Sequence, residues 1–437
     1  MNKFIHALIV FTACQSLFSQ EVYDLNRCIT TGLERNYSIL IARNQETVSD
    51  NNFTPGNAGL LPTFGLNSRY GGTLTNTEQT LTGGEEESSA GIYNTSGDAS
   101  VDLGWTLFRG FSARTTYKKL NELKAIGELN TRMSLENLVA DIVSEYYYYV
   151  QQLQLFKNLR YAVSLSRERV RIDEERYLLG SSSKLQLLQS MVYLNSDSSR
   201  CAKQSEVLKT AQVRLNELMA ADNLDQILVL KDTVISLNTG LIYDSLLIQT
   251  LEANTGLLIA GRNRTVSEYD YKIIASRKYP YLNFSSGYSY SFNNYETGSV
   301  RDRRSNGLNY GLTMGVDLFD GFNRKRERRN ALIDVENKLY QYRQVEKEVL
   351  ADLITIYYAY SNNLRLLKLE NQNLATAREN LEIALERYKL GNLSGLELRE
   401  VQKSLLDAEE RLLAVQYATK LAEVSLLQIS GRIMEYL

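Results

Sequence analysis

The sequence predicts a mainly helical protein built as a tandem repeat, in which each repeat supplies two β-strands and then very long helices. Three observations support this fold class. Proline, which breaks helices, occurs only three times in 437 residues. Blocks of sequence recur at a nearly constant shift along the chain. Each repeat also contains two stretches in which apolar residues alternate with small or polar ones, the pattern of a β-strand.

The internal repeat is the strongest of these signals, and repeats of this kind set the whole architecture. Residues 34–42 match residues 252–260, and residues 105–111 match residues 316–322. The second match continues without a gap through the long helices and carries Arg176 onto Arg387. Agreement of several blocks in the same order is not expected by chance. The chain therefore divides into three parts after its leader, namely a first repeat at 21–220, a connecting segment at 221–242 and a second repeat at 243–437.

The N-terminus predicts a signal peptide at residues 1–20. Lys3 supplies a positive charge, residues 4–18 are mostly apolar, and the small Ser19 precedes a plausible cleavage site. The stretch is too short to span a bilayer as a helix. One alternative is that Cys14 is lipidated, and another is a cytoplasmic protein with a buried N-terminal helix.

The composition argues against an enzyme and against a nucleic-acid-binding protein. The 49 Lys and Arg nearly balance the 51 Asp and Glu, so nucleic acid is not expected as a partner. The only His is His6, and Cys28 and Cys201 are the only cysteines after the predicted leader. We find no metal-ligand spacing, glycine-rich phosphate loop or nucleophile motif. The sequence therefore predicts no catalytic, cofactor-binding or metal site, and a protein that is not an enzyme.

The alternating stretches predict strands of about ten residues with one apolar face and one polar face. They are clearest at residues 282–292 and 308–318. Such strands suit a membrane β-barrel with lipid outside and water inside, and a strand pair of a soluble sandwich is the alternative. Polar loops are expected at 76–96 and 296–306. Four strands cannot close a barrel, and open edges promote aggregation, so other copies must complete it. Twelve strands from three chains is the natural closed solution.

Two exceptionally long helices are expected at residues 111–179 and 322–390, because these stretches contain no proline and a single glycine, Gly127. Each would extend about 100 Å. Charged residues are spread along both, so neither can cross a bilayer, and they are expected to form a coiled-coil-like bundle. Further helices are expected as returning helices after short Gly-Ser turns, at 185–219 and 396–429, and as helices of about 30 residues before each strand pair, at 25–52 and 243–277.

This layout resembles the TolC-type outer-membrane efflux proteins over essentially the whole chain after the leader. The resemblance rests on DLFDG at residues 317–321, on RYxxGxxS at 176–183 and again at 387–394, and on LxxxG at 427–431. Each motif is weak alone, but the duplicated and ordered set is specific. The resemblance implies a homotrimer with one 12-stranded barrel in the outer membrane, in contact with outer-membrane lipid, and a coiled-coil tunnel of long helices in the periplasm.

The family further implies a passive channel subunit of a tripartite efflux or type I secretion system, which exports small molecules or polypeptides. A periplasmic adaptor (membrane fusion protein) and an inner-membrane transporter of the RND or ABC type would be its partners. The rival function is a periplasmic coiled-coil scaffold or adaptor protein. That rival would explain the helices, but it leaves the four alternating strands without a role.

The same resemblance implies that the two Gly-Ser turns form the periplasmic tip. The residues expected to contact the adaptor or close the tip are Arg176, Tyr177, Gly180, Ser183, Arg387, Tyr388, Gly391 and Ser394. The alternative is that Gly and Ser only make the turns.

Some family members carry acidic rings six and nine residues after the turn glycine. These positions hold Glu397 and Glu400 in the second repeat, and Gln186 and Gln189 in the first. In three copies the glutamates would form carboxylate rings that favour cations, and all four residues are therefore candidates for a pore-tip gate. The alternative is that they are ordinary polar residues on a helix face.

A basic run follows the last predicted strand. Residues 324–329 have the sequence RKRERR, and the resemblance places them at the periplasmic boundary of the membrane. Lipid phosphate is one expected partner, and a solvated helix start is the alternative.

Overall fold

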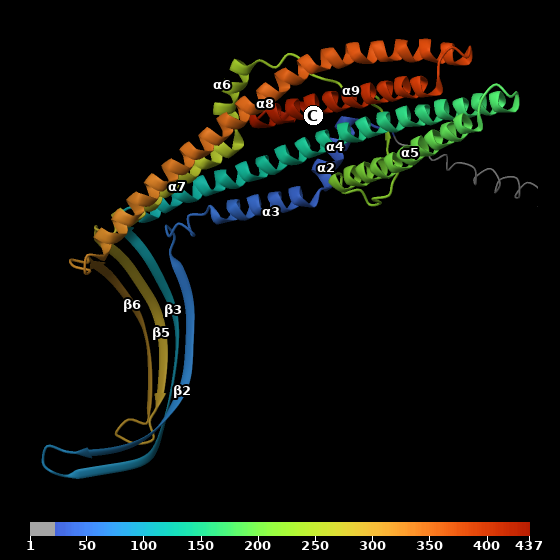
Figure 1. The fold of residues 1–437 in the computed structure, drawn as a ribbon. Coiled ribbons are helices and arrows are strands. Elements are labelled where there is room, and N and C mark those ends of the chain that lie inside the picture. The colour runs from blue at the N-terminus through green and yellow to red at the C-terminus, as the bar shows by residue number, and fades with distance from the viewer. Residues whose placement is uncertain (1–21) are drawn as a thin grey trace, which may run out of the picture. The chain divides into compact units, whose positions relative to one another are not determined.

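The computed structural model describes residues 22–437, so the predicted signal peptide and Cys14 lie outside the described residues. The elements, shown in Figure 1, are β1 (Val22–Tyr23), α2 (Leu25–Arg35), α3 (Tyr37–Asn52), β2 (Thr63–Thr80), β3 (Glu86–Arg109), α4 (Ser112–Leu178), α5 (Lys184–Leu218), β4 (Val229–Leu230), α6 (Tyr243–Ala253), α7 (Thr255–Ser276), β5 (Tyr281–Asn294), β6 (Asp302–Gly315), α8 (Asn323–Lys389), α9 (Gly395–Ile429) and the 3-10 helix η1 (Ile433–Tyr436). The order helix, helix, strand, strand, helix, helix occurs twice. The mainly helical fold class with four long strands is therefore confirmed.

The chain forms two compact units. One unit comprises residues 45–128 and 259–343, and it contains the four long strands. The other comprises the described residues up to 44, residues 129–258 and residues 344–437, and it contains the two helical turns and the connecting segment.

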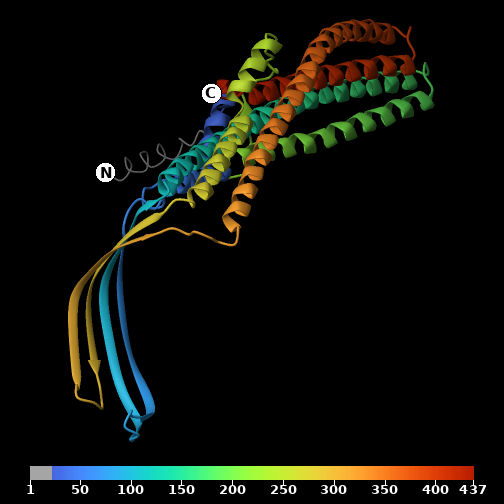
Figure 2. The ribbon, with the colours of Figure 1, turned by 90° about the vertical axis from the view of Figure 1, so that its left-hand side faces the viewer.

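The four long strands form one antiparallel sheet in the order β2-β3-β5-β6, which is visibly curved in Figures 1 and 2. Its central pair, β3 with β5, joins the two repeats. The register pairs Trp105 with Phe284, and Phe284 with Leu312. Residues directly opposite each other share a face of the sheet, so these large apolar side chains gather on one side. The predicted two-faced strands are confirmed.

The strands are longer than predicted. β2 and β3 contain 18 and 24 residues, and they pair from Thr63 with Gly104 out to Thr80 with Glu86. Most of the loop predicted at 76–96 is therefore strand, and this prediction was wrong. Backbone hydrogen bonds continue the ladder beyond the apolar alternation, and the Thr-rich stretch of β2 suits a strand. β6 likewise begins at Asp302, inside the second predicted loop, and ends at Gly315.

The long helices agree closely with the sequence. α4 and α8 each contain 67 residues, and α5 and α9 each contain 35. Their ends lie within about one residue of the predicted bounds, because helix length follows from the absence of breakers. Among residues 22–437, no helix has both the length and the apolar character needed to cross a membrane.

The helices expected before each strand pair are not continuous, so that prediction was wrong. Asn36 and Asn254 have extended backbones and break them into α2–α3 and α6–α7. Each Asn caps the helix that follows: Asn36 Oδ1 accepts from Ser38 N at 2.9 Å and Asn254 Oδ1 from Leu257 N at 2.9 Å. Asn side chains compete with the helix ladder in this way.

Both of these asparagines also hold the end of a returning helix. Asn36 Nδ2 donates to the carbonyl of Leu218 in α5, and Asn254 Nδ2 donates to the carbonyl of Ile429 in α9, both at 2.9 Å. The two repeats therefore use the same tertiary contact at equivalent positions.

We call the unit that contains the two helical turns the helical unit. Its core holds the connecting segment, residues 221–242, against α4. Tyr146 is fully buried and donates to Asp232 Oδ2 at 2.7 Å. Tyr147 Oη and Ser236 Oγ are 2.9 Å apart, and Tyr149 donates to the carbonyl of Leu228 at 3.3 Å. The segment also contributes β4, which pairs in parallel with β1. The sequence patterns contained no signal for this small sheet.

Candidate functional site

The two Gly-Ser turns have nearly the same backbone. Gly180 and Gly391 have φ values of 74° and 82°, a left-handed conformation that favours glycine. After α4, Ser181 N donates to Arg176 O at 2.9 Å, and after α8, Asn392 N donates to Arg387 O at 2.8 Å. This pattern is the Schellman motif that ends a helix at glycine. A Cβ at either glycine would meet nothing within 4 Å, so the backbone angle, and not space, requires glycine.

The serines start the returning helices. Ser183 Oγ accepts from Gln186 N at 3.3 Å, and Ser394 Oγ accepts from Glu397 N at 3.2 Å. Gly180, Ser183, Gly391 and Ser394 are thus fully explained by turn and cap chemistry. Their role as contacts for a partner stays a prediction.

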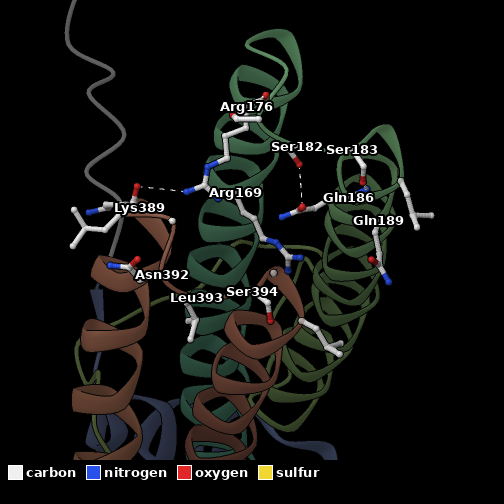
Figure 3. Close-up of a pocket in the computed structure, with 16 residues that line it drawn as sticks. Arg169, Arg176, Ser182, Ser183, Gln186, Gln189, Lys389, Asn392, Leu393 and Ser394 are labelled. Atoms are coloured by element: carbon white, nitrogen blue, oxygen red, sulfur yellow. Dashed lines mark hydrogen bonds between the residues drawn. The ribbon is translucent and has the colours of Figure 1, made fainter.

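The two turns enclose a hollow of about 940 Å³. Figure 3 shows Arg169 and Arg176 projecting from α4, Gln186 and Gln189 lying on α5, and the α8–α9 turn facing them. The predicted residues Ser183, Gly391 and Ser394 also line it. The structure therefore brings turn residues of both repeats to one place.

Arg176 and Tyr388 join the two repeats at this hollow. The Arg176 guanidinium lies over the Tyr388 ring at 4.8 Å, and its Nη2 donates to the Tyr388 carbonyl at 2.5 Å. A longer contact of 3.5 Å reaches the carbonyl of Lys389 (Figure 3). The Tyr388 hydroxyl donates to the buried carboxylate of Asp173. Burial and then this carboxylate raise the pKa of Tyr388.

The equivalent residues of the other repeat do not make these contacts. Tyr177 is exposed. Arg387 is exposed as well, and its Nη2 makes only a 3.4 Å contact with the carbonyl of Asn392 in its own turn. The sequence motif is thus duplicated, but one Arg and one Tyr face inward while their counterparts face solvent.

Sequence reasoning missed an ion pair behind the hollow between the buried Asp197 and the half-buried Arg399. Arg399 Nη1 and Nη2 donate to the two carboxylate oxygens of Asp197 at 2.7 and 2.8 Å, and Ser166 Oγ donates to the same carboxylate at 2.5 Å. Arg169 and Arg399 both lie over the Tyr193 ring, at 5.1 and 5.0 Å. Bidentate pairing of this kind fixes geometry as well as charge, so it locks α5 to α9.

A comparison of the two repeats could have identified Asp173 and Asp197 as unusual from the sequence. At the shift of the long helices, Asp173 corresponds to Ala384, and Asp197 corresponds to Ala408. Both alanines are buried. A carboxylate in place of a buried alanine requires a partner in the fold.

The four residues predicted for the gate differ in their surroundings. Gln186 Oε1 accepts from Ser182 Oγ at 3.0 Å, whereas Gln189 is exposed. Glu397 and Glu400 are exposed on α9 and do not line the hollow. Glu397 completes a capping box, because its Oε2 accepts from Ser394 N at 2.9 Å. This backbone hydrogen bond lowers the pKa of Glu397.

Comparisons with known proteins agree with this fold. Residues 246–432 match the family model described as outer membrane efflux protein. No curated protein matches the chain significantly. The structure is similar to that of CusC, with a TM-score of 0.77, 17% identity, and coverage of 93% of this chain and 92% of that chain.

Two further solved channels are similar at the same coverage of this chain, 93%. They are the outer membrane protein VceC from Vibrio cholerae (TM-score 0.75, 16% identity, 96% of that chain) and the outer membrane channel CmeC from Campylobacter jejuni (TM-score 0.75, 17% identity, 85% of that chain). The second repeat therefore matches the outer membrane efflux protein family, and the chain shares the fold of solved outer-membrane channels over both repeats.

Proposed function

We propose that three copies of this chain form one passive export channel across the outer membrane, with the helical turns forming its periplasmic tip. The observation that carries the proposal is the four-stranded sheet. β2 and β6 are its edges, and each edge presents unpaired backbone groups that must find a partner. Pairing β6 of one copy with β2 of the next satisfies both edges and closes a 12-stranded barrel.

The apolar face of the sheet supports a lipid environment. Leu66 and Tyr310 are 77% and 79% exposed, and many other large side chains on this face are equally uncovered. A soluble sandwich would need a second sheet over them. The only other sheet within residues 22–437 is the two-residue pairing of β1 with β4, which is too small to do so.

The opposite face suits water. Asn67 Nδ2 donates to Asp102 Oδ2 at 2.9 Å, and Ser100 Oγ donates to the same oxygen at 2.7 Å. Gly287 and Asn309 stand beside Asp102 across the sheet. A polar row of this kind on the inward face lines an aqueous conduit, through which substrates pass unchanged.

The partners follow from the same assembly. A periplasmic adaptor would contact the exposed parts of the two turns, including Tyr177 and Arg387, and an inner-membrane transporter of the RND or ABC type would supply the cargo. Small molecules and polypeptides both fit a passive conduit of this kind.

Fractionation and reconstitution test the channel. The full chain is expected in outer membranes as a trimer that resists detergent until it is heated, and it should form ion-conducting pores in planar bilayers. A soluble periplasmic monomer, or a trimer that never conducts, would reject the proposal and favour the scaffold alternative.

The acidic ring is tested by Glu397→Gln with Glu400→Gln. Gln at 397 can still accept from Ser394 N, so the cap is kept while the charge is removed. Block of single-channel current by divalent cations is expected to weaken. Within one chain the hydrogen bond from Ser394 N lowers the pKa of Glu397, which favours its charged form.

The matched control is Glu379→Gln with Glu382→Gln, which removes two exposed charges from α8. An equal loss of cation block in this control would show that total charge, and not a ring at Glu397 and Glu400, attracts the cations.

A further inference from the structure

A basic hollow lies at the start of α8. Its volume is about 550 Å³, and it is lined by Phe322, Lys325, Arg326, Arg329 and Asn330. Within residues 22–437, the side chains of Lys325 and Arg329 make no hydrogen bond or ion pair, and the side chain of Arg326 makes only a 4.0 Å ion pair with its neighbour Glu327. Three cationic groups therefore line one hollow, and Glu327, at the limit of ion-pair distance from Arg326, is the one anionic group paired with any of them among the described residues.

The electrostatics of the helix make this arrangement costly. The first turn of α8 contains no acidic residue, and cations are unfavourable at the positive end of a helix dipole. In the described part of the chain, Asp320 pairs with Arg324 alone. The backbone N and the Nε of Arg324 donate to Asp320 Oδ2 at 2.8 and 2.9 Å. The remaining cations favour an external anion at this place.

The hollow borders exposed apolar surface. Leu318 is 89% exposed and Phe322 is 68% exposed, and the rings of Phe319 and Phe322 meet edge to face at 5.3 Å. These side chains follow directly after β6, whose apolar face carries the exposed Met314. A ligand that fits both surfaces must have an anionic head and an apolar tail.

The first repeat contains a reduced version of the same feature. Phe108 and Phe111 also meet edge to face, at 5.1 Å, and Phe111 and Phe322 share a positive φ of 66° and 64°. Exposed cations follow Phe111 at Arg114 and Lys118, as Lys325 and Arg329 follow Phe322. Residues spaced i, i+3 and i+7 share a helix face.

The repeats differ at the third cation. Arg326 corresponds to Thr115 in the first repeat. The first repeat therefore forms the equivalent turn and helix start without a cation at this position.

We propose that this hollow binds the phosphate headgroup of an anionic phospholipid in the periplasmic leaflet of the outer membrane. The acyl chains would lie against Phe319, Phe322 and Met314. The proposal rests on the membrane placement proposed above. It assigns one strong site to the second repeat and one weaker site, at Arg114 and Lys118, to the first.

Native mass spectrometry of the detergent-solubilised full-length protein tests the site, with phosphatidylglycerol and phosphatidylcholine as probes. Wild type should bind phosphatidylglycerol preferentially. Lys325→Gln with Arg326→Gln and Arg329→Gln should weaken phosphatidylglycerol binding by roughly ten- to hundredfold and leave phosphatidylcholine binding unchanged. Arg114→Gln with Lys118→Gln should have a smaller effect.

The control is Lys347→Gln with Arg365→Gln and Lys368→Gln, which removes three exposed cations elsewhere on α8. An unchanged lipid preference in the Lys325, Arg326 and Arg329 variant, or an equal loss in the control, would overturn the proposal. Dissociation of the trimer in that variant would also overturn it, because the hollow would then be a contact with a neighbouring copy.

Conductance separates this inference from the proposed function. The variant at Lys325, Arg326 and Arg329 should form pores with the wild-type conductance. Wild-type pores without a preference for phosphatidylglycerol would reject the lipid site alone, whereas the absence of pores in wild type would reject the channel.

Discussion

Asp197→Ala is expected to destabilise the unit that contains the two helical turns by about 3 kcal/mol, the lower end of the range for breaking one side of a buried ion pair, because Arg399 is only half-buried. The carboxylate of Asp197 is buried and accepts hydrogen bonds from Arg399 and Ser166. Its removal leaves the Arg399 guanidinium without a counter-charge, on the same Tyr193 ring as the buried Arg169. Arg169 keeps its own ion pair with Asp173 at 3.7 Å, whereas Arg399 would be left unpaired in a poorly solvated place.

Heating curves of helical circular dichroism, at one fixed protein concentration and scan rate, measure this effect. The double variant Asp197→Ala with Arg399→Leu removes both charges and should recover most of the loss. Asp222→Ala is the control and should change little, because Asp222 is exposed and its one side-chain ion pair within residues 22–437 is with Arg35 at 3.4 Å. A wild-type curve for Asp197→Ala would contradict a structural role for the pair.

In the proposed channel, Tyr388→Phe is expected to open the tip and to increase single-channel conductance. The Tyr388 hydroxyl is the only hydrogen-bond donor to Asp173 among residues 22–437, since Oδ2 of Asp173 has no hydrogen-bond partner. Loss of the hydroxyl leaves the buried carboxylate without this hydrogen bond, although Arg169 Nε still pairs with it at 3.7 Å, at a cost of about 1–3 kcal/mol. If this contact holds α8 to α4 only in the closed tip, the closed-to-open ratio falls about tenfold for each 1.4 kcal/mol.

Tyr177→Phe is the matched control, because Tyr177 occupies the equivalent position in the first repeat and is exposed. Its conductance should equal that of wild type. Equal conductance for Tyr388→Phe and Tyr177→Phe would mean that the contact with Asp173 does not hold the tip closed.

The stability that the contact between Tyr388 and Asp173 contributes should fall at high pH. The pKa of Tyr388 is raised above its ordinary value of 10.0, so the folded state retains the proton more strongly than the unfolded chain. The contact therefore contributes fully below about pH 10 and is lost as the pH rises through the higher folded value.

Much of the architecture was predictable from local patterns. Absence of proline defined α4 and α8 almost to the residue, and period-two alternation identified the faces of β5 and β6. The strand ends were less predictable, because the ladder between β2 and β3 continues through polar residues as far as Thr80 and Glu86. Pairing with a neighbouring strand, and not apolar content, decides where such a strand ends.

The candidate site was only partly predictable. The repeated motif predicted the same role for Arg176 as for Arg387, and the same role for Tyr177 as for Tyr388. The fold separates them, because Arg176 and Tyr388 meet across the two repeats while the other two face solvent. Glu397 was predicted as a ring residue, which stays a prediction, and the structure shows that it caps α9.

The sequence by itself determined the duplicated plan, the long helices and the two-faced strands, because each depends on the order and spacing of neighbouring residues. Only the tertiary structure decided where Asn36 and Asn254 break the helices, and which carboxylates are buried. Those features depend on groups far away in the chain: Leu218 for Asn36, Ile429 for Asn254, and Arg399 for Asp197. A buried polar group needs such a partner. The first repeat has buried Asp173 and Asp197 with partners at positions where the second repeat has Ala384 and Ala408.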